Sequence, residues 1–166
     1  DLGYSLISKT KRFNALVFGG EKATVMAGRQ EVLGHHNIRM IPVKEDMSHL
    51  FLVNEALDNN EIMSMPADRI IGSAKSVTSV FMEAEARFPA GPLSVATMKG
   101  LDVLAVNVMK TSAKHYKVYV ARLSYDKQAP RRQQMQQLAD SYVKELERRV
   151  RQYPLQWFNF YDFWSR

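Results

Sequence analysis

The chain has 166 residues, 46% of them hydrophobic and 24% charged, which is typical of a single globular domain and excludes a wholly disordered protein. It contains no cysteine, so disulfides, zinc–thiolate sites and cysteine nucleophiles are excluded. No apolar run approaches the roughly 18–20 residues of a membrane-spanning helix. The 23 Lys and Arg against 17 Asp and Glu give a net charge of +6. This surplus favours an anionic partner, whether nucleic acid, an acidic carrier protein or lipid headgroups.

Strand and helix patterns alternate over the first 65 residues. Short apolar runs predict strands, and the segments between them carry apolar residues at helical spacing: strands 13–18, 38–43 and 61–65, helices 21–33 and 47–59. Pro42 restricts the second strand to an edge, an end or a bulge. Such alternation is typical of βαβ units, so we predict a largely parallel central sheet flanked by helices.

The second half of the chain predicts a different arrangement. Residues 77–82 and 86–89 indicate a short extended excursion, and 91–100 a compact helix between Gly91-Pro92 and Gly100. Residues 103–109 and 116–123 predict a hairpin at the sheet edge. Residues 131–153 predict the longest helix, because apolar residues recur there at steps of three and four. We therefore predict one α/β domain over residues 1–166.

The chain begins with Asp1 and with a segment that has the pattern of a helix interior or first turn. A domain cut from a longer chain explains this start better than a removed signal peptide. We therefore expect the sequence to be the C-terminal portion of a longer protein.

Two sets of polar residues follow predicted strands. Asp68 and Arg69 come after strand 61–65 and Pro66, where an acid and an arginine could hold a polar group or stabilise an oxyanion. The alternative is a salt-bridged loop pair. Arg39 and Lys44 flank the strand that contains Pro42, where they could bind phosphate or simply solvate the strand ends.

Other chemistries have little support. The four histidines form no metal-ligand pattern, and there is no Gly-x-Ser-x-Gly nucleophile motif. Helix 131–151 carries many charges, which we interpret as a solvated face or as a docking surface for anionic lipid or an acidic protein: Arg131, Arg132, Lys144, Arg148, Arg149 and Arg151 against Asp140, Glu145 and Glu147.

Residues 153–164 hold seven aromatic side chains in twelve positions, a density that requires a specific environment. It predicts either a final helix packed on the core or an aromatic surface at a membrane interface. Base stacking is a third reading, but the segment has no Lys or Arg before Arg166, which counts against nucleic acid.

This tail resembles a known family. The sequence Pro-Leu-Gln-Trp-Phe-Asn-Phe at 154–160, followed by Phe163-Trp164, is similar to the C-terminal signature of the bacterial lysophospholipid acyltransferase superfamily. The closest branch is that of the late acyltransferases of lipid A biosynthesis. Residues 39–44, 57–69 and 88–92 resemble further blocks of that family, so the similarity covers essentially the whole chain.

The resemblance implies roles for particular residues. The family carries a His-x-x-x-x-Asp/Glu motif whose His deprotonates the acceptor hydroxyl, and Asp1 would be the acid of that motif. Asp68 matches the acid of a later block, although Arg69 stands where relatives often have Gln. Arg29, Arg39 and Lys44 would contact phosphate on the acceptor or on the donor's phosphopantetheine.

The resemblance also implies a glycerol-3-phosphate acyltransferase-like fold and an O-acyltransferase without metal or other cofactor. It would transfer a fatty acyl chain from acyl carrier protein or coenzyme A to a hydroxyl of a membrane lipid. The enzyme would work at the cytoplasmic face of the bacterial inner membrane, in contact with anionic lipid and not with nucleic acid. Without the upstream histidine, the 166 residues alone are expected to be inactive. The alternative is a non-catalytic domain of the same fold that binds lipid or the acyl carrier.

Overall fold

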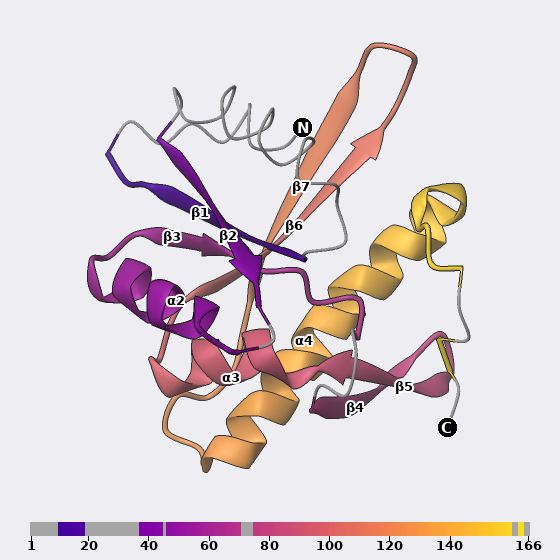
Figure 1. Cartoon of the computed structure of the whole chain (residues 1–166). Coiled ribbons are helices and arrows are strands. Elements are labelled where there is room, and N and C mark those ends of the chain that lie inside the picture. The colour runs from indigo at the N-terminus through magenta and orange to yellow at the C-terminus, as the bar shows by residue number, and fades with distance from the viewer. Residues whose placement is uncertain (1–9, 19–36, 45, 71–74, 161–162, 165–166) are drawn as a thin grey trace. The chain divides into compact units, whose positions relative to one another are not determined.

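The computed structural model describes residues 10–18, 37–44, 46–70, 75–160 and 163–164 (Figure 1). The chain divides into two compact units, an N-terminal unit, Asp1–Pro66, and a C-terminal unit, Ala67–Arg166. The mixed α/β class, the parallel sheet and the long C-terminal helix are confirmed. The grouping of residues 1–166 into one domain stays a prediction.

The N-terminal unit contains a parallel sheet with strand order β2-β1-β3: β1 Phe13–Phe18, β2 Ile38–Val43 and β3 Ile62–Ser64. Helix α2, His49–Asp58, connects β2 to β3. Pro42 lies on the outer strand of the described sheet, where its missing N–H costs no ladder hydrogen bond. Because all three strands are parallel, their carboxyl ends meet at one edge of the sheet. The predicted helix 21–33 lies outside the described residues.

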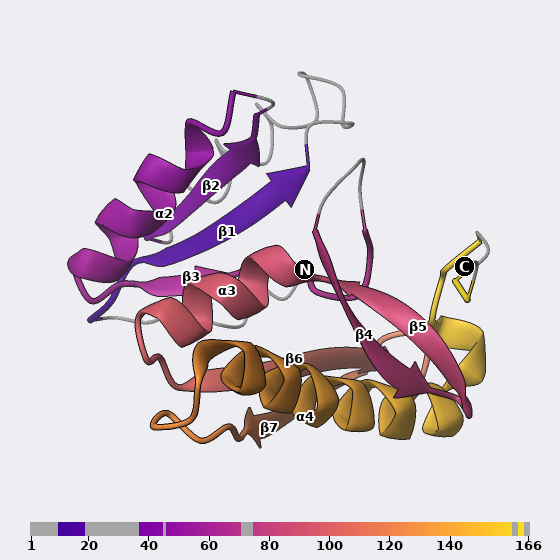
Figure 2. The same ribbon diagram turned by 90° about the horizontal axis from the view of Figure 1, so that it is seen from below.

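The C-terminal unit is built from two hairpins and two helices (Figure 2). β4, Ser76–Phe81, pairs antiparallel with β5, Ala84–Pro89, and β6, Val103–Lys110, pairs antiparallel with β7, Tyr116–Leu123. The other elements are α3 Ala90–Met98, α4 Arg131–Gln152 and the single turn η2 Pro154–Gln156. The predicted extended excursion is thus a complete hairpin.

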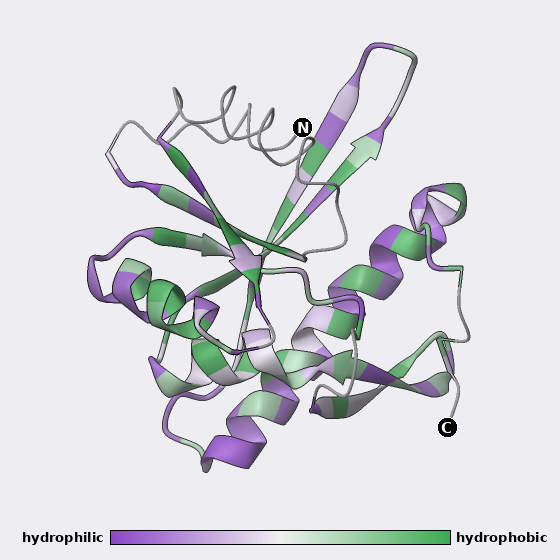
Figure 3. Ribbon diagram, in the orientation of Figure 1, coloured by the Kyte–Doolittle hydropathy of each residue, from purple (hydrophilic) through white to green (hydrophobic). Residues whose placement is uncertain are grey.

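Helix α4 holds this unit together, because its two halves belong to two hydrophobic clusters. Leu138 and Ala139 pack with α3 and the β6–β7 hairpin. Val143, Leu146 and Val150 pack with Phe81 and Phe88 of the β4–β5 hairpin. The colouring in Figure 3 shows the alternation of hydrophobic and hydrophilic residues along α4 that such packing requires.

The aromatic tail divides into a buried and an exposed part. Trp157 and Phe163 lie with ring centroids 5.1 and 5.5 Å from that of Phe81, and the Trp164 indole N–H donates to the Phe81 carbonyl at 3.0 Å. Phe158 and Phe160, by contrast, are 64% and 91% exposed. After η2, none of the described tail residues is helical, so the rings on the core are not held by the predicted final helix, and a membrane interface for the exposed rings stays a prediction.

Candidate functional site

Lys44 lies at the carboxyl edge of the parallel sheet, directly after β2, and is exposed. Its backbone N–H donates to Nδ1 of His49 at 3.2 Å, and His49 is buried at the start of α2. That hydrogen bond occupies Nδ1 as an acceptor, so the neutral imidazole carries its proton on Nε2. Nearby, the Ser48 N–H donates to Asp46 and is the main cause of the lowered pKa of this carboxyl.

Arg39 lies near the opposite end of the same strand. Its Nη1 is 3.3 Å from Oε2 of Glu55 on α2. Five residues of extended chain separate Arg39 from Lys44, which is roughly 16 Å at about 3.3 Å per residue. The two cations therefore do not form one phosphate site by themselves, and Lys44 is the one at the edge where parallel sheets bind ligands.

Asp68 and Arg69 belong to the C-terminal unit. Arg69 donates from Nη2 to the carbonyl of Phe158 at 3.1 Å and to Oδ1 of Asn159 at 3.2 Å. Within the described part of the chain no ion pair joins Asp68 to Arg69, so the salt-bridged alternative is not the arrangement observed. Only Nη2 of Arg69 is used in these bonds, which leaves other guanidinium N–H donors for a ligand.

Asp68 is half-buried and lies close enough to Tyr142 of α4 to affect its ionisation. The pKa of the Tyr142 phenol is raised, mainly by burial and secondly by the negative charge of Asp68. Asp1 and Arg29 lie outside the described residues, and their roles stay predictions.

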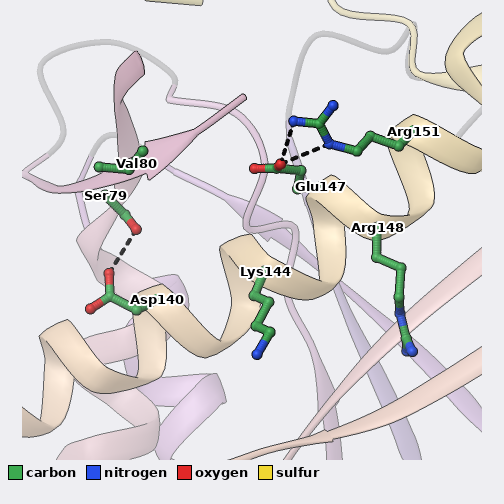
Figure 4. A pocket seen from close by; sticks show the side chains of 7 residues that line it. All are labelled: Ser79, Val80, Asp140, Lys144, Glu147, Arg148 and Arg151. Atoms are coloured by element: carbon green, nitrogen blue, oxygen red, sulfur yellow. Dashed lines mark hydrogen bonds and ion pairs between the residues drawn. The ribbon is translucent and has the colours of Figure 1, made fainter. Parts of the chain in front are cut away.

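A hollow on the surface of α4 gathers several charges (Figure 4). It is lined by Ser79 and Val80 of β4 and by five charged residues of the helix: Asp140, Lys144, Glu147, Arg148 and Arg151. Asp140 accepts a 2.7 Å hydrogen bond from the Ser79 hydroxyl, and Arg151 pairs with Glu147 at 2.8 Å. Lys144 has no hydrogen-bond or ion-pair partner among the described residues. Among the described residues Lys144 is thus the cation of the hollow that is left for an acidic partner, because Arg148 pairs with Glu145 and Arg151 with Glu147.

Glu147 also fixes the β4–β5 turn. Its Oε2 accepts the backbone N–H of Met82 at 2.9 Å, and that bond, followed by the one from Arg151, lowers the pKa of Glu147. Met82 and Glu83 have φ of 52° and 71°, the left-handed conformations that a two-residue turn between paired strands requires. The carboxylate is thereby committed to the turn and not available to a ligand.

Glu145 and Arg149 are buried, so the prediction that they lie on the solvated face of the helix is wrong. Their side chains are only 8% and 7% exposed, and Arg149 Nε donates to Glu145 Oε1 at 2.8 Å. The guanidinium carbon lies 4.0 Å from the ring centroid of Tyr119 on β7, and Nη1 donates to Gln152 at 2.8 Å. Charge pattern alone did not reveal this burial, because it depends on a strand far away in the sequence.

Tyr119 continues this buried network. Its hydroxyl lies 2.6 Å from that of Tyr153, which directly follows α4. The shared hydrogen bond is the main cause of a lowered pKa at Tyr119 and of a raised pKa at Tyr153. Since Arg149 and Tyr153 both contact Tyr119 of β7, these contacts fix the hairpin on the helix.

The described helices include none that is long and apolar enough to cross a bilayer, and the described residues contain no cluster of three potential metal ligands. The architecture is that of an α/β protein with a parallel sheet in its N-terminal unit and, in its C-terminal unit, Asp68, Arg69 and a charged helix surface. The family model described as bacterial lipid A biosynthesis acyltransferase matches residues 22–166. The chain belongs to this family, which supports acyltransferase activity in general. A search of curated proteins found no match.

Proposed function

We propose that this protein is an O-acyltransferase that moves a fatty acyl chain from an acyl carrier protein or coenzyme A thioester to a hydroxyl of a membrane lipid. The family match over residues 22–166 is the observation that carries this proposal. The acceptor oxygen attacks the thioester carbonyl, an ester C–O bond forms and the C–S bond breaks. The hydroxyl proton passes through the general base to the leaving thiolate. This reaction needs no metal or redox cofactor, because the thioester is already activated.

In this proposal the general base is a histidine five residues before Asp1, as the resemblance implies, and Asp1 would orient its imidazole. Asp68 and Arg69 are proposed to hold the reacting groups, with Arg69 directing its remaining N–H donors to negative charge on the substrate. Lys44 and Arg29 are proposed to bind phosphate. Arg39 is the weakest of the proposed phosphate ligands, because it already pairs with Glu55.

The carrier partner is supported by charge. An acyl carrier protein is acidic, and Lys144, Arg148 and Arg151 present cations at spacings of four and three residues along α4. We propose this hollow as the carrier-docking surface of an enzyme that works at the cytoplasmic face of the bacterial inner membrane. Exposed cations of this kind would mainly accelerate association, and the effect would weaken with salt.

The test uses the product of the full-length coding sequence. It is incubated with radiolabelled acyl carrier protein thioester and a total bacterial lipid extract, beside Asp68→Ala and the control Glu85→Ala. Glu85 is an exposed acid on β5 of the same unit. We expect label in lipid with the wild type and the control, and none with Asp68→Ala. Binding of carrier or lipid without transfer by any of the three would instead favour the non-catalytic binding domain.

A further inference from the structure

An exposed aromatic and basic surface lies where the tail meets the tip of the β6–β7 hairpin. Tyr116 and Phe158 line one hollow together and are 58% and 64% exposed. The ring of Phe160, 91% exposed, lies 6.3 Å from that of Phe158. We call these three residues, together with Lys110 and Lys114, the tail–hairpin surface. A cluster of exposed aromatic rings in a folded unit marks an interaction site more often than scattered apolar residues do.

The exposed part of the tail is held in place by two anchors. The Gln156 side chain accepts the backbone N–H of Lys110 and donates to its carbonyl, both at 2.8 Å, as a neighbouring strand would. On the other side, Arg69 donates to the Phe158 carbonyl and to the Asn159 side chain. Trp157, between these anchors, packs against Phe81. The outward direction of Phe158 therefore results from a fixed backbone and not from a frayed end.

The charge beside these rings has one sign. Residues 110–117 have the sequence KTSAKHYK, with three lysines, one histidine and no carboxylate. Neither Lys110 nor Lys114 has an ion-pair partner among the described residues. Lys117 lies 5.0 Å above the ring of Tyr119, on the side that faces α4. Unpaired lysines beside phenyl rings complement a binding partner whose interior is apolar and whose outer layer is anionic.

We propose that the tail–hairpin surface inserts into the interface of an anionic phospholipid bilayer. Phe158 and Phe160 enter the boundary between headgroups and acyl chains, Tyr116 lies at the headgroup level, and Lys110 and Lys114 contact lipid phosphates. A bilayer interface fits both features of this surface, because it offers an apolar layer to the exposed rings of Phe158 and Phe160 and phosphates to the lysines. The proposal rests on the proposed function only in that the acceptor lipid resides in a membrane; binding itself requires no catalysis.

The test measures sedimentation of the 166-residue chain with phosphatidylcholine vesicles, with and without roughly one third phosphatidylglycerol. Phe158→Ser/Phe160→Ser removes the rings, and Lys110→Gln/Lys114→Gln removes the charges. The control Phe51→Ser removes a 79% exposed phenyl on α2 that contacts no other aromatic ring among the described residues. Tryptophan emission checks that the C-terminal unit keeps its fold in each variant, because Trp157 and Trp164 pack there, and far-UV circular dichroism checks the N-terminal unit of Phe51→Ser.

We expect the wild type and Phe51→Ser to bind anionic vesicles, and the double phenylalanine variant to bind at least about tenfold more weakly. The double lysine variant should lose the preference for phosphatidylglycerol and the salt dependence. Equal binding by the phenylalanine variant and the wild type, or binding of nucleic acid but not of vesicles, would overturn the proposal. Vesicle binding that depends on the rings, in a full-length protein that transfers no acyl chain, would refute only the proposed function.

Discussion

The buried pair Glu145–Arg149 allows a sharp test of the structure through Glu145→Gln. The substitution keeps the shape of the side chain but leaves the guanidinium of Arg149, 7% exposed, without its countercharge. Removing one partner of a buried ion pair costs about 3–5 kcal/mol of the free energy of unfolding. Arg149 keeps its bond to Gln152 and its contact with the Tyr119 ring, so we expect a loss near the lower limit, about 3 kcal/mol.

Urea unfolding followed by tryptophan fluorescence measures this loss. Both tryptophans, Trp157 and Trp164, belong to the C-terminal unit that contains the pair. With a denaturant slope of about 2 kcal/mol per M, a loss of about 3 kcal/mol lowers the midpoint by about 1.5 M. The control Arg151→Gln breaks a pair whose arginine is 51% exposed, and it should cost less than about 1 kcal/mol.

The double variant Glu145→Leu/Arg149→Met separates charge burial from packing. It removes both charges, so no unpaired charge stays inside, and we expect it to be more stable than Glu145→Gln despite carrying two substitutions. The reasoning is refuted if Glu145→Gln costs no more than Arg151→Gln. It is also refuted if the double variant is the least stable of the three, because removing both charges would then cost more than leaving one of them unpaired inside the protein.

Three further predictions concern the same unit. Burial raises the pKa of the Tyr142 phenol above 10.0, so at high pH the folded state keeps a proton that the unfolded chain loses. The free energy of unfolding should therefore be unaffected by this group below about pH 10. Above that pH it should fall by up to about 1.4 kcal/mol per pH unit. Tyr142→Phe should flatten this decline in denaturation curves between about pH 9 and 11, and an unchanged slope would contradict it. Glu83 has a φ of 71°, a left-handed conformation that glycine adopts without strain, so Glu83→Gly should raise the thermal unfolding midpoint by the equivalent of up to about 1 kcal/mol. A lower midpoint would show that the 3.7 Å ion pair between Glu83 and Arg151 contributes more to stability than the relief of strain. Gln156→Ala deletes both bonds to the Lys110 backbone and should cost about 1–2 kcal/mol, with faster amide exchange at Lys110; unchanged exchange would refute the anchor.

Local patterns were sufficient to predict most elements. The runs 13–18 and 38–43 match β1 and β2 at both ends, because each is a short apolar segment whose flanking residues interrupt the pattern. The expected helix 47–59 is α2, His49–Asp58, and the expected helix 131–153 is α4, Arg131–Gln152. In both helices the spacing of apolar residues carries the information, and the bounds differ by at most two residues at either end.

Contacts between distant segments were not predictable in this way. Glu145 and Arg149 have the sequence pattern of a surface pair, yet both are buried, and the Arg149 guanidinium lies over the ring of Tyr119 on β7. The tail shows a similar limit: its aromatic density predicted a special environment, but the anchor from Gln156 to β6 decides which rings are exposed. Neither contact leaves a periodic signal in the sequence.

The sequence predicted which residues belong to the candidate site, but it did not predict how their side chains are arranged. Lys44 does lie at the carboxyl edge of the parallel sheet, as the order of elements implied. The position of Arg69 against the carbonyl of Phe158 could not be foreseen, since the partner is a backbone atom far along the chain. The roles of Asp68 and Arg69 in catalysis stay predictions until substrate is tested.

The most direct test of the acyltransferase account follows both products of one reaction. The full-length protein is mixed with labelled acyl thioester and lipid, and released thiol and labelled lipid ester are measured together. The account predicts that thiol and ester form in equal amounts, and that Asp68→Ala abolishes both while Glu85→Ala changes neither. Thiol release without ester would indicate a hydrolase, and substrate binding without either product would indicate a binding domain; each result would contradict the account.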